Sequence, residues 1–222
     1  MTTLPDRPDA PGEPSRGFAD LVLAVATELL GHRDELNRLD GVAGDGDLGL
    51  TVSSAARALI DLGSTLAPLP EAEAIRRCGT EIARRAPSTG GTLIAFALMA
   101  AARAGVDPDA AALDRAAGYV AAAADSVALR GGVTPGDRTM LDALGPASDA
   151  LRAAAGRGDD SASAARDAAG AAEAGALATA GMAARVGRAG WLADRAAGHE
   201  DAGARLVALA MAAGARHVAD GG

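Results

Sequence analysis

The 222-residue chain contains no lysine, and all 21 of its basic residues are arginine. The absence of lysine excludes three kinds of site that depend on it. These are the P-loop, the ATP site of protein kinases with its lysine on strand β3, and Schiff-base catalysis. Any phosphate charge would have to be met by metal ions, backbone N–H groups and arginine side chains. The net charge of −8 and the pI of about 4.8 argue against nucleic acid as a partner.

Cysteine and aromatic residues are also scarce. Cys78 is the only cysteine, which excludes an intrachain disulfide and a cysteine-based zinc cluster. Aromatic residues make up 2% of the chain although 49% of it is hydrophobic, so the core has to consist mostly of Ala, Leu and Val. Such small side chains favour closely approaching helices over a sheet, and the length suits one domain with a substantial core. We therefore expect an all-α fold.

Long apolar runs are missing as well. The most apolar segment, residues 93–102, is too short to span a bilayer and is followed by Arg103. Residues 1–16 carry four prolines and no apolar stretch, so we expect a flexible leader and not a signal peptide. Residues 17–222 are expected to form a single domain in the cytoplasm, with no membrane contact.

Helical periodicity recurs along the chain and is interrupted by glycine and proline turns. It predicts about eight helices, at approximately residues 17–38, 48–62, 71–85, 92–104, 107–130, 137–155, 161–185 and 204–218. Four irregular segments between them combine glycine with polar residues, at 40–49, 87–91, 131–139 and 187–203. Because alternate loops of an antiparallel bundle fall at the same end, one site can be built from several of these segments.

Three aspartates stand close together in the first irregular segment. Asp40, Asp45 and Asp47 would repel one another unless a cation neutralised them. Ligation by oxygen alone suits Mg²⁺ or Ca²⁺ better than zinc, and the interspersed glycines let the backbone approach a ligand closely. The pattern predicts a magnesium-dependent phosphate site. A solvated turn with helix caps is the alternative that this segment alone leaves open.

Four segments, in order, resemble the motifs of the nucleotide-binding L subunit (the DAK2 domain) of dihydroxyacetone kinases. They are Leu39–Val52, Ser88–Thr92, Gly131–Asp142 and Gly187–Ala204, against family patterns of the approximate form LDxxIGDGDHGxNM, GGxSG, GxxPGDKTMxD and GRAxYLGERSxGHxDPGA. The resemblance covers the chain from about residue 15 to its end. It implies a barrel of about eight antiparallel helices, with the nucleotide and two Mg²⁺ ions in the loops at one end.

The resemblance also implies roles for individual residues. Asp40, Asp45 and Asp47 would hold the two Mg²⁺ ions that bridge the phosphates of ADP or ATP. The backbone amides that follow Asp47 would add an anion site at a helix start. The family identifies no catalytic side chain in this subunit, because transfer there depends on positioning and on magnesium. The nucleotide itself would be contacted by Leu48, Gly49, Thr51, Thr89, Gly90, Gly131, Met140, Arg188, Asp201 and Gly203.

In this family the L subunit supplies the nucleotide, and a separate K-type subunit or domain holds the ketose. The resemblance therefore implies a phosphotransferase subunit that needs a K-type partner and passes a phosphoryl group to dihydroxyacetone or a related short ketose. In one branch of the family a phosphotransferase-system protein is the phosphoryl donor, and in another ATP exchanges freely. The sequence does not distinguish these two branches.

Three positions depart from the family patterns. Leu48 replaces a histidine, Thr51 replaces an asparagine, and residues 88–92 differ from the glycine-serine motif. Two alternatives to an active kinase subunit consequently stay open. One is a diverged, non-catalytic module that senses nucleotide or regulates a partner, and the other is an alanine-rich helical scaffold without a nucleotide site.

Overall fold

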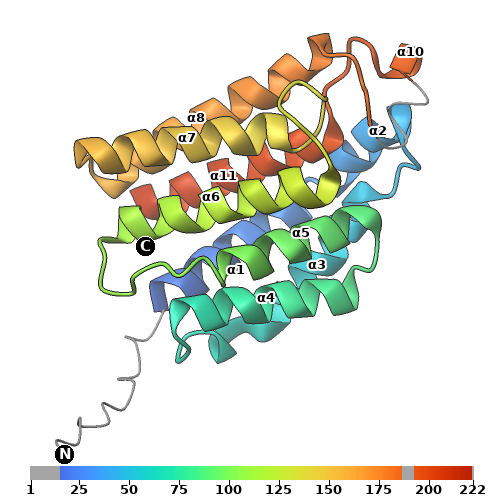
Figure 1. Cartoon of the computed structure of the whole chain (residues 1–222). Coiled ribbons are helices and arrows are strands. Elements are labelled where there is room, and N and C mark those ends of the chain that lie inside the picture. Colours follow the sequence, from blue (N-terminus) through green and yellow to red (C-terminus); the bar gives the residue numbers. More distant parts are fainter. Residues whose placement is uncertain (1–15, 187–192, 222) are drawn as a thin grey trace, which may run out of the picture.

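Residues 16–186 and 193–221 are described by a computed structural model, in which every regular element is a helix (Figure 1). This part of the chain contains no strand, so the all-α prediction is confirmed. Three of the elements are short: the 3-10 turns η1 (Gly63–Thr65) and η2 (Thr179–Gly181), and α10 (Ala193–Ala196). The longer helices are α1 (Arg16–Leu30), α2 (Arg33–Ala43), α3 (Leu48–Leu62), α4 (Glu71–Arg85), α5 (Thr89–Ala101), α6 (Ala112–Gly131), α7 (Leu141–Arg157), α8 (Ser161–Ala178) and α11 (Ala202–Ala219).

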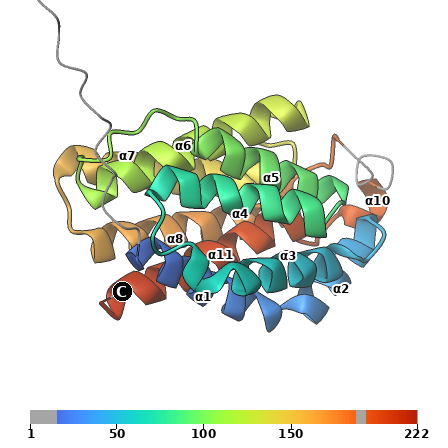
Figure 2. The ribbon, with the colours of Figure 1, turned by 90° about the horizontal axis from the view of Figure 1, so that it is seen from below.

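Eight of these helices form a ring in which neighbours run antiparallel (Figures 1 and 2). The order around the ring is α1, α3, α4, α5, α6, α7, α8 and α11, and α11 packs against α1 to close it. This is also their order in the chain, so each connection joins two neighbours and alternate connections gather at one end. The short α2 follows α1 and packs on α3 at that end. The predicted eight-helix barrel is confirmed.

Small residues allow neighbouring helices to approach closely. On α8, Ala164, Ala168 and Ala172 are fully buried in the largest core cluster, where they pack with side chains of α7 and α11. Gly175 continues this face of α8, and a Cβ atom added there would lie 2.1 Å from the carbonyl oxygen of Asp142 on α7. The alanine-rich composition is thus used for backbone proximity between helices.

Several predicted helix boundaries were wrong. Residues 17–38 form two helices, because Gly31 and His32 make a turn in which their amides donate to backbone carbonyls of the last turn of α1. The second of them, α2, runs on through Ala43, so Asp40 lies in a helix instead of a loop. The alanine-rich helix predicted to end near Arg185 stops at Ala178. The ranges 48–62 and 71–85 are observed as predicted, and the remaining predicted ends shift by a few residues.

Helix α5 begins earlier than predicted because of a local hydrogen bond. The Ser88 side chain accepts a hydrogen bond from the Gly91 backbone N–H at 3.0 Å and caps the helix there. Thr89 and Gly90, which were predicted to lie in a turn, are therefore the first helical residues.

Among the described helices, none is both long enough and apolar enough to span a membrane. Residues 1–15, most of the expected leader, lie outside the part of the chain that the structure describes.

Candidate functional site

A cavity of about 1020 Å³ lies at the barrel end that carries α2 and α10 in Figure 1. Its walls come from the α2–α3 turn, the start of α5, the α6–α7 connection and the segment that leads into α11. These are the four irregular segments that stand out in the sequence. Most of the predicted site residues line it, namely Asp40, Asp45, Asp47, Leu48, Thr51, Thr89, Gly90, Gly131, Met140, Asp201 and Gly203.

Two predicted site residues stand apart from this lining. Gly49 lies against α2, where an added Cβ atom would be 1.9 Å from the Arg33 carbonyl oxygen. Its role in the structure is to let the start of α3 touch α2. Arg188 lies outside the described residues.

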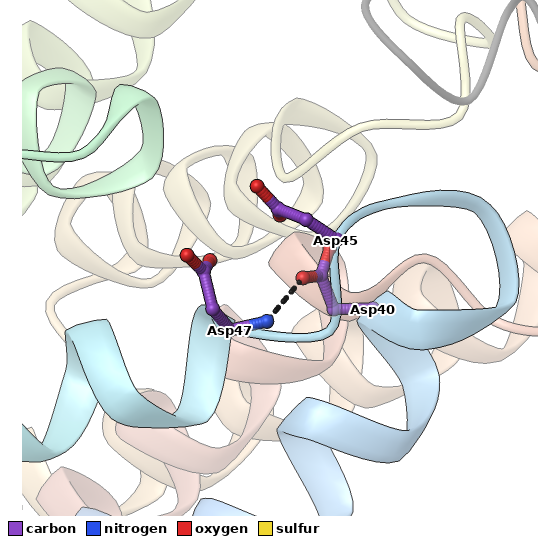
Figure 3. A group of neighbouring side chains, drawn as sticks. All are labelled: Asp40, Asp45 and Asp47. Carbon is purple, nitrogen blue, oxygen red and sulfur yellow. Dashed lines mark hydrogen bonds between the residues drawn. The ribbon is translucent and has the colours of Figure 1, made fainter.

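The three aspartates gather at the α2–α3 turn (Figure 3). One carboxylate oxygen from each of Asp40, Asp45 and Asp47 lies within 4.8 Å of the others. Asp40 reaches from the last turns of α2 to the start of α3, where its Oδ2 accepts hydrogen bonds from the backbone N–H groups of Asp47 (3.0 Å) and Leu48 (3.3 Å). These two hydrogen bonds hold the Asp40 carboxylate in place and stabilise the turn between α2 and α3.

Glycine is required inside this turn. A Cβ atom on Gly44 would lie 2.2 Å from Asp40 Oδ1, and Gly46 has a φ of 76°. The turn can therefore bring three carboxylates together only with glycine at both positions.

The donor set of this cluster fits a hard divalent cation. Three carboxylates concentrate negative charge in one place, and Mg²⁺ and Ca²⁺ both take oxygen ligands of this kind. Oxygens on opposite sides of one Mg²⁺ are roughly 4 Å apart, so the observed spacing requires little adjustment. Asp40, Asp45 and Asp47 could hold such an ion between α2 and α3.

Two helix N-termini meet beside the aspartates. Thr51 Oγ1 of α3 donates to Ser88 Oγ at 3.1 Å, and Ser88 caps α5. Gly90 of α5 lies against Leu48 of α3, with 3.4 Å between an added Cβ atom and Leu48 Cδ1. The positive dipole ends of both helices therefore lie at the cavity, which favours a bound anion. At α3 the N–H groups of Leu48 and Leu50 already donate to the side chains of Asp40 and Asn37, so the N–H groups for an anion are those at the start of α5.

Ser88 lines the cavity too, although it was not among the predicted site residues. A serine directly before a helical stretch is an N-cap signal in the sequence, and it could have located this residue.

The cavity wall formed by α5, α6 and the α6–α7 connection is apolar. Val127, Val133, Met140 and Leu93 line it and belong to one hydrophobic cluster. Gly203, at the start of α11, lies against Met140, since an added Cβ atom would be 3.3 Å from the Met140 Cβ. The cavity thus offers carboxylates and helix N-termini at one side and, at another, an apolar slot lined by these residues, which suits a ligand with an anionic and a less polar part.

Asp201 begins the wall formed by α11. Its Oδ1 accepts from the Ala204 N–H at 2.8 Å, and its own N–H donates to Thr179 Oγ1 at 2.8 Å. Burial raises the pKa of this carboxyl to about 6, although the hydrogen bond from Ala204 and the charge of Arg138 act in the opposite direction.

Two further residues that line the cavity, Arg138 and Glu200, were not predicted from the sequence. Arg138 is 4% exposed and has a φ of 63°. It lies in the irregular segment 131–139, two residues before Met140, but the sequence carries no signal for its burial. Glu200 is held by Arg205, whose Nε donates to Glu200 Oε2 at 2.7 Å.

A sequence model of the DAK2 domain matches residues 42–216 of the chain. The chain belongs to the DAK2 domain family. Relatives include the bovine (Bos taurus) triokinase/FMN cyclase, 35% identical over 212 residues, and the D-erythrulose kinase of Mycolicibacterium smegmatis, 39% identical over 204 residues. These alignments cover 94% and 89% of this chain but 36% and 34% of the relatives, so the DAK2 chain spans about a third of their length.

Solved structures agree with this assignment. The dihydroxyacetone kinase of C. freundii in its native form matches with a TM-score of 0.72 at 27% identity, over 97% of this chain and 37% of that one. The same enzyme in complex with AMP-PNP and Mg²⁺ matches with a TM-score of 0.71 at 26% identity, over the same shares. The chain thus belongs to a family of kinases, and a structural neighbour holds a nucleotide analogue and magnesium.

Proposed function

We propose that this DAK2 domain is the nucleotide-binding, L-type subunit of a dihydroxyacetone-type kinase. It would bind ADP or ATP with two Mg²⁺ ions and pass a phosphoryl group to dihydroxyacetone, or a related short ketose, on a K-type partner. The observation that carries the proposal is the aspartate cluster, which faces the N-termini of α3 and α5 in one cavity. The kinase names of the relatives support the reaction class.

The phosphate end of the nucleotide would lie at the aspartates. Asp40, Asp45 and Asp47 would hold the Mg²⁺ ions, and when bound these would neutralise both the carboxylates and the phosphates. The chain's own contribution is positional, since Asp40 fixes the turn and the start of α5 at Thr89 and Gly90 would direct N–H groups toward the anion. No side chain of this domain need take a proton.

The base would occupy the apolar slot. Met140 and Gly131 would contact one face of it, and Asp201 and Gly203 would close the pocket from α11. Arg188 remains a proposed contact on the strength of the family pattern. Residues 17–222 would form the single cytoplasmic domain, with residues 1–16 as a leader.

A non-catalytic, nucleotide-sensing module is the second candidate, and Leu48 is the observation that favours it. Leu48 packs with the hydrophobic cluster around Leu36 and Val52, so the position next to the last aspartate offers the phosphates no polar group. Such a module would bind nucleotide and transfer nothing.

Phosphoryl transfer distinguishes the two candidates. The purified chain is combined with its K-type partner, ATP, Mg²⁺ and dihydroxyacetone, and formation of the ketose phosphate is followed. We expect turnover that requires both proteins and that falls at least about 100-fold in Asp45→Asn, since the lost carboxylate is a metal ligand. Nucleotide binding without any turnover, in the wild type as well as in Leu48→His, would instead establish the sensing module.

A further inference from the structure

Arg138 is the buried cation of the cavity. Its side chain is 4% exposed, and burying a guanidinium is costly unless its N–H groups find acceptors. Among the described residues that line the cavity it is the one basic residue, and the same lining contains five acidic ones: Asp40, Asp45, Asp47, Glu200 and Asp201.

The α6–α7 connection holds Arg138 in place through its neighbours. Asp142, at the start of α7, accepts hydrogen bonds from the backbone N–H groups of Gly136 (2.5 Å) and Thr139 (2.8 Å), one on each side of Arg138. The backbone of Arg138 has a φ of 63°, a conformation that residues other than glycine seldom adopt. The connection is thus folded tightly at the point where Arg138 leaves it.

From there the guanidinium reaches the segment that leads into α11. Its Nη2 donates to the carbonyl oxygens of Ala196 (3.2 Å), His199 (2.9 Å) and Glu200 (3.3 Å). These three residues closely precede Asp201, which begins the α11 wall of the cavity. One side chain therefore joins two connections that are about 60 residues apart in the sequence.

The tethered segment adjoins the apolar wall of the cavity. Gly203 follows it and lies against Met140, two residues beyond Arg138 in the other connection. The aspartate cluster is instead braced by contacts within the α2–α3 turn, such as the hydrogen bond from Asp47 N–H to Asp40. The aspartate turn thus has hydrogen bonds of its own, and its packing contact with the tethered segment is the small apolar cluster of Ala43 and Ala196.

We propose that Arg138 is a positioning residue that sets the width of the slot for the nucleoside part of the ligand. This inference rests on the proposed nucleotide-binding function. Without the tether, residues 196–203 move relative to Met140, and the nucleoside loses its closely fitting wall. The phosphate end keeps its own support. Loss of Arg138 therefore weakens binding of a nucleotide but not binding of a phosphate chain that has no nucleoside.

The geometry also selects the substitutions. All three carbonyls are reached by one terminal nitrogen, and Nε has no hydrogen-bond partner within the described part of the chain. A lysine ammonium has three N–H donors on one nitrogen and is one bond shorter than arginine, so Arg138→Lys retains the charge and the donors and restores the tether in part. Arg138→Met retains much of the length and removes all the donors.

The experiment measures Mg²⁺-dependent binding of ADP and of inorganic pyrophosphate by calorimetry. Arg138→Met should weaken ADP binding by about tenfold or more and leave pyrophosphate binding within about twofold, whereas Arg138→Lys should recover part of the loss. Arg115→Met is the matched control. Arg115 also holds a backbone carbonyl, that of Ala110, but at the opposite end of the barrel, so its loss should lower the melting temperature and leave both affinities unchanged.

Three results would overturn the proposal: ADP binding that Arg138→Met leaves unaltered, equal losses for ADP and pyrophosphate, or no recovery with lysine. Absence of ADP binding in the wild type would instead refute the proposed function, and this inference with it. If Arg138→Met does not fold, amide hydrogen exchange of the wild-type protein tests the proposal instead. ADP with Mg²⁺ should protect the amides of residues 196–204 and pyrophosphate should not, and equal protection by both ligands would contradict the proposal.

Discussion

At Asp201, the gain from capping a helix is opposed by the cost of burying a charged carboxylate. It caps α11 through Ala204, yet protein surrounds most of its carboxyl, and this partial burial raises its pKa to about 6. A carboxyl whose folded pKa lies above its unfolded value binds a proton more tightly in the folded protein. Its ionisation therefore opposes folding as the pH rises from about 4 to 6.

Replacement of Asp201 by asparagine should remove this penalty, because asparagine caps a helix as well as aspartate does. We expect Asp201→Asn to raise the free energy of unfolding by about 1–3 kcal/mol at pH 7.5 and to have little effect at pH 4. Urea unfolding of both proteins at the two pH values measures this difference. An effect of the same size at both values would show that the ionisation of Asp201 is not its cause.

At the scale of helices, the barrel depends on glycine and alanine at close contacts. Gly175 and Gly170 lie on the same helix, α8, and form a natural pair. The first lies against the Asp142 carbonyl oxygen, whereas an added Cβ atom on the second would have no heavy atom within 4 Å. The two glycines thus differ in what surrounds them and not in the helix that carries them.

Alanine at these two glycines should have opposite effects. Gly175→Ala forces α8 away from α7 and should lower the free energy of unfolding by about 1–3 kcal/mol. Gly170→Ala gains helix propensity at no steric cost and should raise it by about 0.5–1 kcal/mol. Chemical denaturation of the two variants checks the signs. A loss of stability in both would mean that the α7–α8 distance does not decide the outcome.

Helices were predictable where periodicity and turn residues agreed. The ranges 48–62 and 71–85 were predicted as they are observed, because glycine or proline stands at their limits. The break at Gly31 was not foreseen, since the apolar pattern continues across it. The glycines at residues 90 and 91 led to the prediction of a loop there. The residues are helical instead, because Ser88 caps the helix that begins directly after it.

The site was predictable to the extent that its chemistry is local in the sequence. Asp40, Asp45 and Asp47 are separated by only a few residues of the chain, so the sequence alone predicted that they lie together, as the structure shows. Arg138 is different, because its partners lie about 60 residues away and only the barrel brings them within reach. Contacts between connections that are far apart in the chain produce no local pattern from which the sequence could predict them.

For the whole molecule, the ring of helices places four connections around one cavity and leaves its charge unbalanced. Five acidic residues line the cavity against one arginine among the described residues, in a chain of net charge −8. Divalent cations bound together with a nucleotide would offset part of the negative charge of the carboxylates and of the phosphates, and both ligands would stabilise the folded barrel by mass action. Each ligand should therefore need the other.

Calorimetric titration of ADP into the nucleotide-free protein, with and without Mg²⁺, tests this account most directly. Asp45→Asn is compared with Asp109→Asn, which alters an exposed aspartate in the α5–α6 connection, at the opposite end of the barrel. We expect binding that requires Mg²⁺, that is weakened at least about tenfold in Asp45→Asn and that is unchanged in Asp109→Asn. Binding that is independent of Mg²⁺, or equal affinity in the two variants, would contradict the assignment of the aspartate cluster as the metal site of a nucleotide-binding domain.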